Sequence, residues 1–244
     1  MSSRFLTQFT RRGFLEASAG TVLSSFCARS PAGPAWNNLR FIHDPEPGAI
    51  IRNALDDAAL LLERGGIPRP LRAQANGIWT VDDVVVASSP ESSVLPSEWK
   101  CLTDRSGAFR LLVPREGPGL IIAGADPEGA RNGLYAWLEL NDFAFFRDGE
   151  HIPRILSGRS VAPIDEEVRP DFRWRGDMIW DNYLGPSRYC AATWGIAEWE
   201  QALLFMARNG LNFLEFYLPL EGVFLRGFPE ATTLQDGVLW KTES

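Results

Sequence analysis

Residues 170–218 constrain the fold most strongly, because their hydrophobic pattern indicates strand, helix, strand. Residues 172–179 form a short apolar run that follows a proline, which is typical of a strand. Residues 211–218 are short and apolar and are predicted to be a second, buried strand. Between them, four apolar residues recur at helical spacing ahead of Gly210, a residue that favours a helix C-terminus. These residues are Ile196, Trp199, Leu203 and Met206.

A strand–helix–strand segment of this length normally closes as a right-handed crossover with parallel strands. This arrangement is the repeating unit of a (β/α)8 barrel, which takes about 250 residues. Residues 170–244 provide only 75 residues. We therefore expect this segment to be the incomplete start of such a barrel.

Composition excludes several classes of protein. Of the 244 residues, 45% are hydrophobic, which suffices for a packed core, and the net charge of −7 argues against nucleic-acid binding. No apolar run approaches the roughly 20 residues of a membrane span. With three Cys and two His and no Cys-x-x-Cys pair, we expect neither a metal site nor a cofactor. His43 and His151 lie at the edges of predicted elements without a neighbouring metal ligand.

The N-terminal 35 residues are predicted to be an export signal. Arg11 and Arg12 lie within Thr-Arg-Arg-x-Phe-Leu, a pattern typical of twin-arginine signals, and a weakly apolar stretch follows. We therefore expect a periplasmic or extracellular protein. Export would leave Cys101 and Cys190 in the mature chain, and the sequence leaves a disulfide between them open.

Residues 37–156 are predicted to form a small α+β domain with helices on one face of a sheet. The strands are expected at 39–43, 79–87, 109–113, 120–123 and 143–146, and the helices at 47–64 and from Pro127 onward. Residues 115–119 are predicted to join the strands 109–113 and 120–123 as a hairpin. Asp126 is a suitable cap for the second helix, and Glu128 lies near its positive N-terminal end. Residues 157–169 are polar and charged and are predicted to be a linker.

Residues 119–153 resemble an accessory domain of known glycosidases. The pattern is an apolar strand, Gly-x-Asp, a helix with Gly-x-Tyr-x-x-Leu, then Phe145-Phe146 and Ile152-Pro153. It is similar to the domain that precedes the catalytic barrel in bacterial β-N-acetylhexosaminidases, α-glucuronidases and α-N-acetylglucosaminidases. The resemblance implies a glycoside hydrolase and an oligosaccharide or polysaccharide substrate.

The barrel start of these families is also matched, and the matches leave the subfamily open. Phe-Arg-x-Arg-Gly ends at Gly176, and Met-Ala-x-Asn ends at Asn209. Residues 180–182 resemble the first-strand end of xylan α-glucuronidases, whereas residues 198–200 are closer to α-N-acetylglucosaminidases. Hexosaminidases would have an arginine where this chain has Leu184.

Five residues are predicted to contact the substrate; each also has a structural interpretation. By resemblance Arg175 matches a sugar-contacting arginine, but it could instead pair with Asp177 or Glu215. Asp181 could bind a hydroxyl or cap a loop, and Glu221 could line the same mouth or be a solvated acid. Glu215, between apolar neighbours, is expected to be a paired interior or interface charge. The five candidates are Arg175, Trp180, Asp181, Asn182 and Glu221.

No catalytic residue is assigned. Glycoside hydrolysis usually needs two carboxyl groups, or one carboxyl group plus an acetamide of the substrate, and in barrels the catalytic groups commonly lie on later strands. We therefore expect the N-terminal part of an exported glycoside hydrolase acting on glycans with amino sugars or uronic acids, without its catalytic carboxylates. The alternatives are a non-catalytic carbohydrate-binding or interaction module, or an enzyme completed by a separate chain. The oligomeric state is not predicted.

Overall fold

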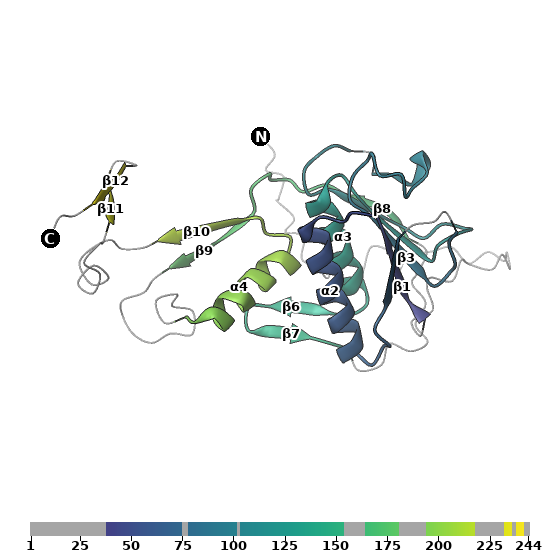
Figure 1. Ribbon diagram of the computed structural model, residues 1–244, viewed down its shortest axis with the longest axis horizontal. Coiled ribbons are helices and arrows are strands. Elements are labelled where there is room, and N and C mark those ends of the chain that lie inside the picture. Colours follow the sequence, from purple (N-terminus) through teal and green to yellow (C-terminus); the bar gives the residue numbers. More distant parts are fainter. Residues whose placement is uncertain are drawn as a thin grey trace, which may run out of the picture. The chain divides into compact units, whose positions relative to one another are not determined.

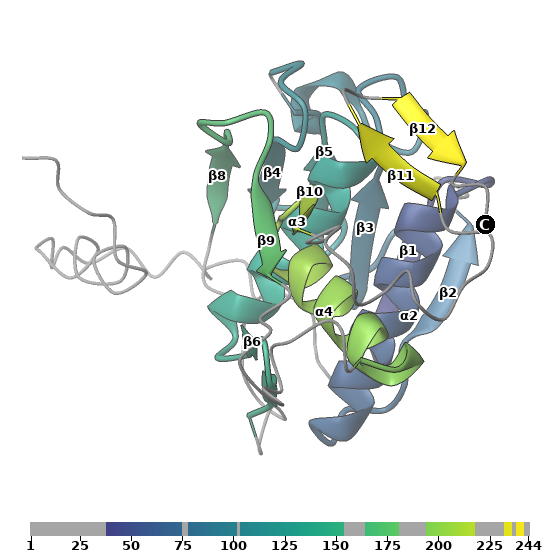
Figure 2. The same cartoon turned by 90° about the vertical axis from the view of Figure 1, so that its left-hand side faces the viewer.

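The computed structural model describes residues 38–74, 78–101, 103–153, 164–180, 194–217, 232–235 and 238–241. Within them the chain forms a mixed α/β fold around a six-stranded sheet, drawn in Figure 1 and, from the side, in Figure 2. In spatial order its strands are β2 (Leu71–Gln74), β1 (Arg40–His43), β3 (Asp83–Ala87), β5 (Leu120–Gly124), β4 (Phe109–Leu112) and β8 (Asp165–Val168).

Strand directions divide this sheet into two parts. β2, β1, β3 and β5 are mutually parallel, whereas β4 is antiparallel to both β5 and β8. The predicted hairpin is β4–β5 and is confirmed. β3 begins later than expected, because the buried carboxylate of Asp83 accepts the backbone N–H of Thr80 at 2.6 Å and so holds a turn ahead of the strand.

Two helices, α2 (Ala49–Arg64) and α3 (Pro127–Leu140), cover one face of the sheet, as predicted (Figure 1). Asp126 caps α3 by accepting the N–H of Gly129 at 2.6 Å. The core between helices and sheet is apolar and buried. Its fully buried large side chains include Phe41, Leu55, Leu62, Leu120, Ile122, Leu134 and Trp137.

The opposite face of the sheet is covered by the segment between β3 and β4, which contains the short helix η2 (Ser97–Trp99). Val94, Leu95 and Cys101 pack from this segment onto Val85 and Ile121 of the sheet. Both faces of the central strands are therefore buried, which explains their continuous apolar sequences.

Three strands of this region were not predicted: β2, β7 (Gly149–His151) and β8. β2 and β8 are the edge strands of the large sheet, and their side chains are mostly exposed, so they lack a hydrophobic pattern. β7 pairs antiparallel with β6 (Ala144–Phe146) in a separate hairpin. β8 lies within residues 157–169, which we expected to be a linker. We refer to β1–β8 with α2 and α3 as the sheet domain.

After the sheet domain, β9 (Gly176–Trp180), α4 (Ile196–Arg208) and β10 (Phe213–Tyr217) form the predicted strand–helix–strand unit. β9 and β10 are parallel and pair from Gly176 with Phe213 to Trp180 with Tyr217. Gly210, just after α4, has φ of 69°, the left-handed conformation expected of it. A further hairpin, β11 (Thr232–Gln235) with β12 (Val238–Lys241), was not predicted.

The hydrophobic stripe expected on α4 is only partly buried. Met206 is buried, but Ile196 is 79% and Leu203 is 51% exposed. The helix buries Ala202 and Arg208 instead. None of the helices in the described ranges combines the length and hydrophobicity that a bilayer crossing requires.

Candidate functional site

Two of the five predicted substrate-contacting residues are described by the structure, and they lie at opposite ends of β9. Arg175 directly precedes the strand, and Trp180 is its last residue, opposite Tyr217 of β10. Asp181, Asn182 and Glu221 lie outside the residues that the structure describes. The site can therefore be built from side chains only at the amino end of the strands.

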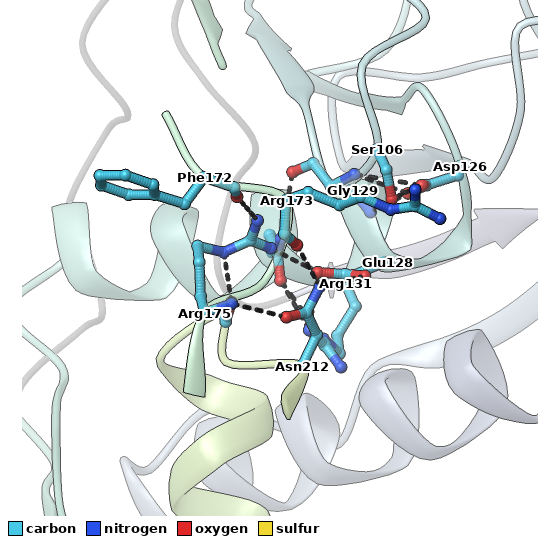
Figure 3. A network of polar contacts seen from close by, with 12 residues as sticks. Ser106, Asp126, Glu128, Gly129, Arg131, Phe172, Arg173, Arg175 and Asn212 are labelled. Atoms are coloured by element: carbon cyan, nitrogen blue, oxygen red, sulfur yellow. Dashed lines mark hydrogen bonds and ion pairs between the residues drawn. The ribbon is translucent and has the colours of Figure 1, made fainter. Parts of the chain in front are cut away.

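Arg175 is the centre of a polar network at that amino end (Figure 3). Its Nε donates to the carbonyl of Gly210 at 2.9 Å, and its Nη1 donates to the carbonyl of Phe172 at 2.7 Å. Its Nη2 forms an ion pair with the carboxylate of Glu128. All three guanidinium nitrogens thus have protein partners, and the Gly210 carbonyl lies at the C-terminus of α4, where a cation is favourable.

Asn212 connects the same network to β10 (Figure 3). Its Oδ1 accepts the backbone N–H of Arg175 at 2.9 Å, and its Nδ2 donates to Glu128 Oε2 at 3.1 Å and to the carbonyl of Arg173 at 2.9 Å. One carboxylate, that of Glu128, therefore receives hydrogen bonds from residues preceding both β9 and β10. Charge-assisted bonds of this kind fix orientation as well as adding energy.

Local sequence explains why Glu128 lies there. It occupies the first turn of α3, whose cap Asp126 also accepts the hydroxyl of Ser106 at 2.8 Å and the N–H of Gly107. Gly107 has φ of 76°, and a Cβ added to it would lie 2.7 Å from Nη2 of Arg175. The turn before β4 thus leaves space for the guanidinium because residue 107 is a glycine.

The pairing expected for Arg175 with Asp177 or Glu215 is wrong, because its carboxylate partner is Glu128. Asp177 instead forms an ion pair with Arg147, in the turn of the β6–β7 hairpin. Within the described part of the chain Glu215 makes no ion pair and its side chain is exposed, so it is not a paired interior charge, whereas a role at an interface stays a prediction. Sugar contact by Arg175 remains a prediction; its place at the amino end of β9 favours the structural interpretation.

Sequence reasoning noticed Glu128 only as an acid near a helix N-terminus and overlooked Arg147 and Arg208. The sequence around a charged residue does not indicate a partner that is distant in the chain. Glu128 and Arg175, for example, are 47 residues apart. Burial lowers the pKa of Arg131, near Glu128 and Arg175, which identifies it as a half-buried member of the same network.

Metal-binding and redox residues are sparse in the described ranges. They contain no group of three or more His, Cys, Asp or Glu that could hold a metal ion. His43 Nδ1 lies 2.6 Å from the carbonyl oxygen of Asp44. Cys101 has a free, buried thiol, and burial raises its pKa, whereas Cys190 lies outside the described residues.

No family model and no curated protein matches this chain. Solved structures share part of its chain path, and two of them serve as examples. One is the GH20 β-N-acetylhexosaminidase from Streptomyces coelicolor A3(2), at 18% identity and a TM-score of 0.47, with 77% of this chain covering 32% of that one. The other is the N-acetyl-β-hexosaminidase of Streptomyces plicatus in complex with Thio-NAglucal, at 20% identity and a TM-score of 0.46, with 78% covering 32%. This chain spans about a third of their length, and similarity at this level says nothing of what it binds.

Proposed function

We propose that this chain is the N-terminal part of an exported glycoside hydrolase that acts on glycans containing amino sugars or uronic acids. The supporting observation is the parallel pairing of β9 and β10 around α4, with the amino ends of both strands bonded to Glu128. In (β/α)8 enzymes the substrate binds at the opposite, carboxyl ends of the strands. The motifs at residues 172–176 and 206–209, which resemble those of glycosidases, belong to this same unit.

Under this proposal, substrate contacts come from the residues at and after the carboxyl ends of β9 and β10. Trp180 offers a face on which a sugar ring can stack, and Asp181 and Asn182 can bind hydroxyl groups. Glu221 follows β10 and would line the same mouth. Cleavage of a glycosidic bond usually needs two carboxyl groups flanking the bond, or one carboxyl group assisted by the acetamide of the substrate, and we place these groups on later strands of the barrel.

The test combines turnover and binding by the purified chain. We expect no turnover of aryl N-acetylglucosaminides or of glucuronoxylan, and weak binding of the matching oligosaccharides in calorimetry. Trp180→Ala and Asp181→Asn should each weaken that binding about tenfold, because each removes one contact of roughly 1.4 kcal/mol. Asp171→Asn, at the amino end of β9, is the matched control and should leave it unchanged. Robust turnover would contradict the absence of the catalytic pair.

A non-catalytic carbohydrate-binding module is the second candidate, and exposed aromatic side chains favour it. Phe172 is 72% and Trp174 is 63% exposed. Trp174 lies 6.3 Å from the ring of Phe213, and the guanidinium of Arg173 lies over its ring at 5.1 Å. Exposed aromatic faces next to a cation suit a sugar ring with an acidic substituent. If this second candidate function is correct, Trp174→Ala abolishes oligosaccharide binding and Trp180→Ala does not.

The proposal also includes export, which rests on the Arg11-Arg12 pattern. Replacement of both arginines by lysine should block translocation, because twin-arginine recognition depends on the guanidinium pair. Fractionation of cells that express either form measures this. An unchanged periplasmic yield of the double variant would disprove twin-arginine export and leave the glycosidase proposal intact.

A further inference from the structure

A buried arginine lies where α4 meets the sheet domain. Arg208, the last residue of α4, is 9% exposed. Its Nε and Nη2 donate to the two carboxylate oxygens of Asp57 at 2.8 and 2.6 Å, and its Nη1 donates to Glu150 Oε2 at 2.9 Å. Asp57 belongs to α2 and Glu150 to β7. One guanidinium therefore joins three elements that are far apart in the sequence.

Neighbouring side chains complete the bonding of these carboxylates. The hydroxyl of Tyr135, from α3, donates to Asp57 Oδ2 at 2.9 Å, and Arg64 forms an ion pair with Glu150. The guanidinium of Arg208 also lies 5.3 Å from the ring centre of Phe145. Burial by itself lowers the pKa of Arg208, but the hydrogen bonds and charges of Asp57 and Glu150 outweigh it, and the net pKa is raised. The guanidinium thus stays charged.

Several polar contacts attach α4 to the sheet domain. Apart from Arg208, the described side chains that α4 buries are Ala202 and Met206, both small or flexible. Asn209 donates to the carbonyl of Phe145 at 3.4 Å, and Gln201 donates to that of Arg147 at 2.9 Å, which aligns α4 with the β6–β7 hairpin (Figure 1). Small apolar surfaces tolerate sliding, whereas a bidentate guanidinium–carboxylate pair permits essentially one orientation.

We propose that Asp57 and Arg208 are a positioning pair that latches the β9–α4–β10 unit onto the sheet domain, and that this unit opens as one body when the pair is broken. Within the described residues this unit is a two-stranded parallel sheet with one helix, and a core of that size is too small to be stable alone. Its order therefore depends on its attachment points, and Asp57–Arg208 is the most buried ion pair among them. The sheet domain has a separate core between α2, α3 and the sheet, and it keeps its structure when the unit opens.

Amide hydrogen exchange on the full chain at neutral pH tests this. Asp57→Asn keeps the shape of the side chain and removes its charge. We expect exchange in α4 and β10 to become about tenfold faster or more, while the amides of β3 and β5 stay at the wild-type rate, because the two regions open separately. Asp56→Asn is the matched control. Asp56 neighbours Asp57 on α2 but pairs with Arg72 and has a 59% exposed side chain, so exchange should not change.

Two further variants separate a latch from a general loss of stability. Arg208→Lys keeps the charge but loses the bidentate geometry, and it should accelerate exchange of α4 and β10 less than Asp57→Asn does. Adding Arg208→Met to Asp57→Asn should accelerate exchange little beyond Asp57→Asn alone, because the pair acts as a unit and is already broken. Equal acceleration in β3 and β5, unfolding of the whole chain, or wild-type exchange in Asp57→Asn would each overturn the proposal.

Discussion

Several of the described glycines, including Gly129, Gly133 and Gly176, occupy positions where another part of the backbone or core comes too close for a side chain. A Cβ on Gly176 would lie 2.6 Å from the carbonyl oxygen of Phe213, across the β9–β10 pair. One on Gly133 would lie 2.7 Å from Ile122 of the sheet, and one on Gly129 would overlap the backbone of Ala108. These glycines permit strand to approach strand and α3 to approach the sheet.

Gly176→Ala should therefore weaken the pairing of β9 with β10. The neighbour that must move is backbone, so we expect a loss of about 1–3 kcal/mol, the usual cost of overpacking. The free energy of opening of β10, measured by amide exchange, reports this loss. Gly48→Ser is the control, because nothing lies within 4 Å of an added Cβ there and serine suits the helix N-cap. Equal free energies of opening for Gly176→Ala and wild type would contradict the steric argument.

Glu128 is the residue whose loss should most disturb the amino ends of β9 and β10. Glu128→Gln removes the ion pair with Arg175 and weakens the bond from Asn212, at a site where both side chains of the ion pair are 18% exposed. A loss of about 2 kcal/mol is expected in urea unfolding, because a half-buried guanidinium remains without its carboxylate. Glu63→Gln, which breaks an exposed pair with Arg69 at 3.7 Å, should cost less than about 0.5 kcal/mol. Similar losses in both variants would show that Glu128 is an ordinary surface charge.

At the scale of elements, the sequence predicted what depends on local pattern and missed what depends on distant partners. The C-terminal end of α2, the start of α3, the β4–β5 hairpin and the parallel β9–α4–β10 unit follow from periodicity, caps and glycines. β8 was missed because Asp165-Glu166-Glu167 lacks strand character, and it forms a strand only because the edge of β4 is available. The side-chain partners of Arg175 and Arg208 could not be predicted, because they depend on how separate elements pack.

In α4, too, the local sequence pattern predicted the helix but not which of its side chains are buried. Its periodicity predicted a buried stripe that included Leu203 and Met206, but only Met206 is buried. Met206→Ala should therefore cost about 2–3 kcal/mol, and Leu203→Ala less than about 0.5 kcal/mol, since only the former leaves a cavity. Thermal unfolding of the two variants compares them directly. An equal or larger cost for Leu203→Ala would mean that another surface covers this face of α4.

At the scale of the whole molecule, the sheet domain and the β9–α4–β10 unit are joined through ionised side chains, so their attachment depends on pH. Glu150 is a carboxylate of this junction and pairs with both Arg208 and Arg64. Burial alone would raise its pKa, but hydrogen bonds from Arg64 and Arg208 outweigh burial, and the pKa is lowered from its ordinary value of 4.5. The folded chain therefore binds the Glu150 proton less tightly than the unfolded chain.

The sign of the pH dependence follows from that difference. The stability that Glu150 contributes is fully present above pH 4.5, its unfolded value, and is lost as pH falls through the lower folded pKa. The melting temperature of the wild type should thus fall between about pH 5 and pH 3, and Glu150→Gln should start lower at neutral pH but fall less steeply, because it has no proton to gain at this position. Glu116→Gln, in the exposed turn between β4 and β5, should keep the wild-type slope. Parallel curves for wild type and Glu150→Gln would mean that the acid sensitivity arises elsewhere than at the Arg208 junction.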